Sequence, residues 1–73
     1  MTRQPDYYAT LQVDRNADPD VIDAAYRRLA TKYHPDVNQR GDATKRMQEI
    51  NEAHSVLSNP ARRADYDRSR SRV

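Results

Sequence analysis

The stretch DPDVIDAAYRRLATKYHPD, residues 18–36, decides the fold of this 73-residue chain. Asp18 is a good helix N-cap, Pro19 suits the first helical position, and Asp20 is favourable in the first turn. The apolar residues that follow recur every three or four positions, as on one face of a helix: Ile22, Ala25, Tyr26, Leu29, Ala30 and Tyr33. The pattern predicts a helix that buries this face.

A proline fixes where that helix ends. The residue before a proline is pushed out of the helical backbone region, so the helix before Pro35 must end at Tyr33. His34 and Asp36 then fall in a loop directly after a helix. This placement fits a tight turn, a catalytic or metal-binding pair, or a surface that contacts another protein.

Three further helices are expected. One covers DYYATL, residues 6–11, with Asp6 as its cap. Another starts after Gly41, with Asp42 as its cap, and runs to about Leu57; the last opens with Asn59 as cap and Pro60 in its first turn. The sequence therefore predicts an all-α fold in which an eight-residue loop joins two long antiparallel helices.

Composition argues against catalysis and metal binding. The chain has no cysteine, one glycine and two histidines, so thiolate sites and glycine-rich phosphate loops are excluded, and His34 and His54 are too few for a zinc site. His54 lies on the apolar stripe of its helix, where a core-edge residue with a hydrogen-bonded tip is expected. A domain this small has little room for a deep pocket. We expect no enzyme, cofactor or metal.

Charge and hydropathy indicate the compartment and the partner. No apolar run approaches the roughly 20 residues that span a bilayer, and no signal-peptide core is present, so we expect a cytoplasmic monomer. Residues 37–73 carry eight Lys/Arg against five Asp/Glu, which suits an acidic partner, whether protein or nucleic acid. On the helix before Pro35, Arg27, Arg28 and Lys32 form an exposed strip leading to the loop. On the helix alone a solvated face is the favoured reading, and the adjacent loop is what favours a contact surface.

Four collinear segments carry a family resemblance: DYYATLQV, AYRRLATKYHPDVN, MQEINEAHSVLSNP and ARRADYD. Together they resemble the J-domain of DnaJ-type co-chaperones. The resemblance implies four helices, the second and third forming an antiparallel hairpin with the His-Pro-Asp loop between them. Residues 1–5 are then a lead-in, residues 6–68 the J-domain, and residues 69–73 a disordered basic tail.

The resemblance also implies a function: binding a DnaK-type heat-shock chaperone and stimulating its ATP hydrolysis, which is coupled to substrate capture. The residues implied in partner binding are His34, Pro35, Asp36, Tyr26, Arg27, Arg28, Lys32 and Asn38. The sequence departs from the family pattern at several positions, among them Gln12, Asp23, Val37, Met47 and His54. The alternatives are a helical nucleic-acid-binding domain, supported by the basic second half and the arginine-rich tail, and a J-like module that has lost stimulating activity.

Overall fold

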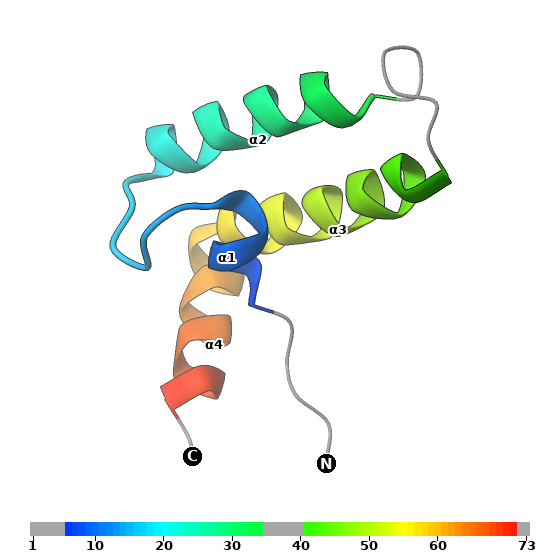
Figure 1. Ribbon diagram of the computed structural model, residues 1–73. Helices are drawn as coiled ribbons and strands as arrows, with labels where there is room; N and C mark the ends of the chain where they lie inside the picture. Colours follow the sequence, from blue (N-terminus) through cyan, green and yellow to red (C-terminus); the bar gives the residue numbers. More distant parts are fainter. Residues whose placement is uncertain (1–5, 35–40, 72–73) are drawn as a thin grey trace.

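Two long helices lie side by side and run in opposite directions (Figure 1). They are α2 (Pro19–Tyr33) and α3 (Gly41–Leu57), flanked by the short α1 (Tyr7–Leu11) and by α4 (Pro60–Ser71). The computed structural model describes residues 6–34 and 41–71, and these residues contain four helices and no strand. The predicted all-α architecture with an antiparallel hairpin is confirmed.

Side chains from all four helices build the core. The apolar stripe of α2 is buried at Ile22, Ala25 and Leu29, as its periodicity predicts. It packs against the stripe of α3, where Ile50 and Ala53 are buried. The remaining core members come from the other elements and from the end of α3: Tyr8, Leu11, Val56, Leu57 and Tyr66.

Helix α1 begins and ends with well-defined caps. The Asp6 carboxylate accepts a hydrogen bond from the backbone N–H of Ala9 at 3.1 Å, which confirms the predicted cap. At the other end, Gln12 adopts the left-handed conformation with φ 59°, which normally favours glycine. The chain therefore turns toward α2 on a residue whose side chain opposes that conformation.

The predicted start of α3 is off by one position. The helix begins at Gly41, and Asp42 lies in its first turn instead of capping it. A carboxylate is favourable at both places, because the cap and the first turn both expose unpaired N–H groups. Sequence alone does not separate the two.

Helix α4 continues to Ser71, so residues 69–71, which were expected in a disordered tail, are helical. Its predicted cap is confirmed: Asn59 Oδ1 accepts from the backbone N–H of Ala61 and Arg62. Arg70 explains the extension. Its guanidinium reaches back to Asp6 at the start of α1 and lies over the Tyr8 and Tyr66 rings. The remainder of the predicted tail, residues 72–73, and the predicted lead-in, residues 1–5, lie outside the described residues.

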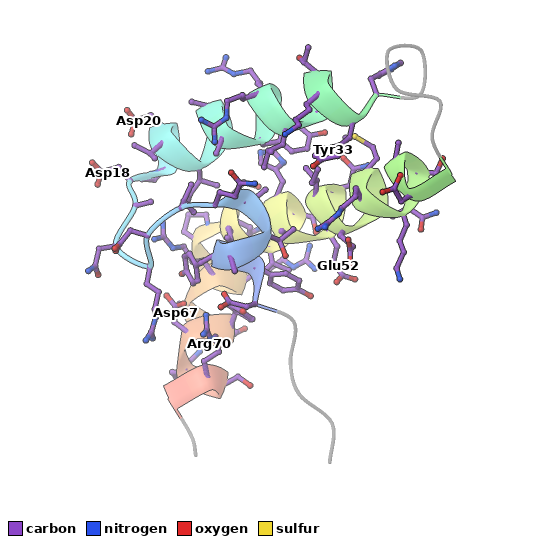
Figure 2. All side chains as sticks on the ribbon, in the orientation of Figure 1. Asp18, Asp20, Tyr33, Glu52, Asp67 and Arg70 are labelled. Carbon is purple, nitrogen blue, oxygen red and sulfur yellow. The ribbon has the colours of Figure 1, made fainter. Side chains whose placement is uncertain are left out.

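Tyrosines and arginines join α4 to α1. The Tyr8 hydroxyl donates to Asp67 at 2.6 Å and accepts from Arg63 at 3.1 Å, and Figure 2 shows Asp67 and Arg70 on α4 beside α1. Arg63 also donates to the carbonyls of Arg15 and Ala17 in the α1–α2 connection. These bonds hold α4 against α1 and the α1–α2 connection. The C-terminal end of α2 and the N-terminal end of α3 lie at the opposite end of the hairpin.

Candidate partner-binding face

The three cations predicted as a strip lie on the surface of α2. Arg27, Arg28 and Lys32 are all exposed, as expected from their angular distance to the buried stripe. They occupy the C-terminal half of α2, where positive charge is favoured by the helix dipole. The charge of α2 is therefore divided, since Asp18 and Asp20 lie at its opposite end (Figure 2).

The end of α2 is built around Tyr33. Its side chain is half-buried between α2 and α3 and packs against the core (Figure 2). The Lys32 ammonium lies 5.4 Å from the centroid of the Tyr33 ring, within the range of a cation–π contact. Lys32 is thus held near the point where the chain leaves the helix.

His34 is the C-cap of α2 and has an extended backbone, φ −61° and ψ 135°. The helix therefore ends at Tyr33, as the following proline predicts. The His34 side chain is exposed. The other predicted loop residues, Pro35, Asp36 and Asn38, lie outside the described residues, so His34 is the one member of the loop set that the structure describes.

Tyr26 differs from the three cations because it faces α3. It is half-buried, and its hydroxyl donates to Asn51 Oδ1 at 2.9 Å. Its ring stacks on the His54 imidazole with centroids 4.0 Å apart and an interplanar angle of 18°. His54 in turn lies with Nε2 3.0 Å from Asp23 Oδ1. The predicted core-edge position of His54, with its tip hydrogen-bonded, is confirmed.

Sequence reasoning missed the role of Asn51 and treated Asp23 only as a departure from a pattern. A signal was present. Asp23 and Tyr26 are three residues apart on α2, as are Asn51 and His54 on α3, so each pair shares a helix face. Pairing the two faces across an antiparallel hairpin would have predicted the contacts.

The surface of α2 carries two shallow hollows beside the strip. One, of about 300 Å³, is lined by Asp23, Tyr26, Arg27 and His54. The second has a similar volume and lies between α2 and the turn after α1, where Arg28 and the exposed Val21 border it. Both are open and small, and they suit contact with protein side chains better than enclosure of a substrate.

Two tyrosines of α1, Tyr7 and Tyr8, have shifted pKa values, and α1 lies away from the basic strip. Burial raises the pKa of Tyr7 and of Tyr8, and hydrogen bonds to Glu52 and Asp67 respectively act in the same direction.

Among residues 6–34 and 41–71, no three His, Cys, Asp or Glu side chains are grouped so as to hold a metal ion. Within the same residues, no helix combines the length and apolar character needed to cross a bilayer.

The structure combines a four-helix domain, a long antiparallel hairpin and exposed cations on α2 next to His34, and these features define the class of protein. The sequence model of the DnaJ domain matches residues 6–67, and the chain belongs to the DnaJ-domain family. It is 60% identical over 62 residues to a chaperone protein DnaJ of Rippkaea orientalis, which covers 85% of this chain and 16% of that protein.

Other relatives give the same result. A chaperone protein DnaJ of Roseiflexus sp. strain RS-1 is 54% identical over 68 residues, covering 93% of this chain and 18% of the relative. Chaperone protein DnaJ 2 of Thermus thermophilus is 52% identical over 67 residues, covering 92% and 24%. The chain thus spans between about a sixth and a quarter of the length of these relatives.

Proposed function

We propose that this chain is a co-chaperone J-domain that binds a DnaK-type heat-shock chaperone in the cytoplasm and stimulates its ATP hydrolysis. One observation carries the proposal. In a chain of the DnaJ-domain family, an exposed run of cations on α2 leads directly to His34 at the end of the hairpin. The stimulated hydrolysis would be coupled to capture of substrate proteins by the chaperone.

The cations would act first. Arg27, Arg28 and Lys32 are exposed in the C-terminal half of α2, and contact of these cations with an acidic surface would speed association and set orientation. His34, Pro35, Asp36 and Asn38 would then contact the chaperone at the loop. A carboxylate such as Asp36 can form a strong charge-assisted bond with an arginine of the partner.

The chemistry of ATP hydrolysis belongs to the partner. The J-domain changes the populations of the partner's conformations, which requires that it bind one of them more tightly. No nucleophile, general base or metal of this chain takes part in the proposal. Stimulation therefore depends on surface contacts, and substitutions on the surface should abolish it without unfolding the domain.

Nucleic-acid binding is less well supported by the structure than by the sequence. Its support in the sequence is the basic second half with its arginine-rich C-terminal segment, but several arginines of α4 form contacts with other groups of the domain. Arg63 bonds to Tyr8 and to two loop carbonyls. Arg68 pairs with Asp65, and Arg70 pairs with Asp6. A titration into bare duplex DNA and into a DnaK-type chaperone with ATP separates the two functions.

We expect saturable, salt-sensitive binding to the chaperone and a higher rate of ATP hydrolysis, with DNA binding no tighter than nonspecific affinity, about 10⁻⁴ to 10⁻⁶ M. Tight binding to DNA without any change in the chaperone's ATPase rate would contradict the proposal.

A further inference from the structure

Four side chains form a continuous chain of contacts across the middle of the hairpin. Asp23 contacts His54, His54 stacks on Tyr26, and Tyr26 donates to Asn51. Two of the four come from α2 and two from α3. We call Asp23, Tyr26, Asn51 and His54 the interhelical lock.

The lock holds the Tyr26 side chain at its hydroxyl group and at one face of its ring. The hydroxyl is held by Asn51 at 2.9 Å, and the ring face is covered by the His54 imidazole at 4.0 Å. A ring held at its tip and its face cannot rotate freely. Side chains fixed before binding lose less conformational entropy on association, so a fixed Tyr26 favours binding.

Asp23 orients the imidazole. Carboxylate oxygens accept hydrogen bonds, so the 3.0 Å contact is a hydrogen bond in the ring form of His54 that donates from Nε2. The side chains of His54 and Asp23 are 28% and 55% exposed, and a pair this exposed contributes little stability by itself. Its effect is directional: it keeps the imidazole parallel to the Tyr26 ring.

The lock borders the cationic strip. Asp23, Tyr26 and His54 line the same hollow as Arg27, and Asp23 precedes Arg27 by four residues, the spacing and order that favour attraction along a helix. Substitution of Asp23 or His54 would therefore change the surface beside Arg27 without removing a buried core side chain.

We infer that His54 is a positioning residue, itself oriented by Asp23, and that it holds Tyr26 and the adjoining surface of Arg27 in the geometry that the partner binds. The inference deepens the proposed function and rests on it. The two residues do not need to touch the partner. They act through Tyr26, so that binding should depend on the ring at position 54 more than on its charge.

The test measures stimulation of a DnaK-type chaperone's ATPase as a function of domain concentration. His54→Ala, which removes the stacked ring, should raise the half-saturating concentration by about two- to tenfold and leave the maximal rate unchanged. His54→Phe keeps a ring without the Asp23 contact and should restore most of the affinity. Asp23→Asn should have the smallest effect, at most about threefold.

Two control variants distinguish positioning from other causes. Glu49→Ala alters an exposed residue of α3 and should leave the half-saturating concentration unchanged. Val56→Ala creates a small defect in the core and should lower thermal stability without changing the half-saturating concentration. If Val56→Ala weakens binding as much as His54→Ala at equal stability, the effect of His54 is only structural and the inference is wrong.

NMR spectra of the free domain provide a second readout. Stacking on His54 should shift the Tyr26 ring protons upfield, and this shift should vanish in His54→Ala and persist in His54→Phe. Unchanged half-saturation in His54→Ala, with stimulation by the wild type intact, overturns the inference and leaves the proposed function standing. Absence of stimulation by the wild type overturns both.

Discussion

The guanidinium of Arg70, near the end of α4, lies 3.1 Å from the carboxylate of Asp6, the residue that caps α1. Asp6 therefore serves two helices, because the same oxygen atom accepts the backbone N–H of Ala9. This contact joins residues 64 positions apart and closes the α1–α4 side of the domain.

Asp6 should stabilise the fold more through its capping hydrogen bond than through its ion pair with Arg70. Asp6→Ala loses both the cap and the ion pair and should cost about 1–2 kcal/mol of unfolding free energy. Asp6→Asn keeps a capping side chain and should cost less than about 1 kcal/mol, because the lost ion pair is exposed. Urea unfolding measures both. Equal losses in the two variants would show that the cap contributes nothing.

Arg70→Ala should cost more than Asp6→Asn, since the guanidinium also lies 5.5 Å from the centroid of Tyr66 and 5.9 Å from that of Tyr8. Arg70→Met, which keeps an apolar stem over these rings, serves as the matched variant and should recover part of the loss. Helical circular dichroism should also fall in Arg70→Ala as the end of α4 frays. A full helical signal would contradict the role that we give to Arg70 in extending α4.

Gln12 should be a site of easy stabilisation. Its left-handed backbone, φ 59°, opposes a side chain, and glycine removes the opposition, so Gln12→Gly should raise the unfolding free energy by about 0.5–1 kcal/mol. The same substitution at Gln48, an exposed position inside α3, should lower it by a similar amount, about 0.5–1 kcal/mol. A loss of stability in Gln12→Gly would mean that the Gln12 side chain makes a stabilising contact.

Stability should fall at alkaline pH through the tyrosines of α1. Burial and hydrogen bonding to acidic side chains raise the pKa of Tyr7 and Tyr8 above the ordinary value of 10.0. The folded state thus favours the protonated phenols, and their contribution is complete below about pH 10 and is lost as pH rises through the raised pKa values. Unfolding free energies measured from pH 8 to pH 11 should show the decline.

A Tyr7→Phe, Tyr8→Phe double variant provides the control. It should be less stable at pH 8, by about 1–3 kcal/mol for loss of the partly buried hydrogen bonds of Tyr8 alone, and its decline above pH 10 should be shallower. An equally steep decline would assign the alkaline transition to other groups.

Much of this fold could be predicted because the signals that start and stop its helices are local in sequence. Pro19 and Pro35 determine where α2 begins and ends, and the 3.6-residue period identifies its buried face. The extension of α4 to Ser71 could not be predicted, because it depends on a contact between Arg70 and the distant Asp6. Local composition alone suggested a frayed, solvated tail.

The candidate site was predictable to a similar degree. The exposure of Arg27, Arg28 and Lys32 follows from their angle to the buried face. The fixing of Tyr26 by His54 and Asn51 depends on the register of α2 against α3, which no single helix encodes. For this reason Asp23 and His54 looked like unrelated departures until the hairpin placed them together.

Reversing the charge of the strip should weaken association more than folding. Arg27→Glu with Arg28→Glu should reduce affinity for a DnaK-type chaperone about tenfold or more at low salt, with a smaller effect at high salt. Both residues are exposed, so the change in unfolding free energy should be small.

Arg62→Glu with Arg68→Glu makes the same change in net charge on α4, where both arginines are exposed, and should leave the affinity near that of the wild type. Equal losses in the two double variants would mean that net charge, and not the α2 strip, drives association.

The most direct test of the proposed function is a single-turnover ATPase measurement on a DnaK-type chaperone, with wild-type domain and with His34→Gln. His34 is exposed at the end of α2 and outside the core, so the variant should keep its helical circular dichroism. We predict that the wild type accelerates hydrolysis and that His34→Gln does not. Equal acceleration by both proteins, or loss of folding in His34→Gln, would contradict the assignment of His34 as a contact residue for the partner.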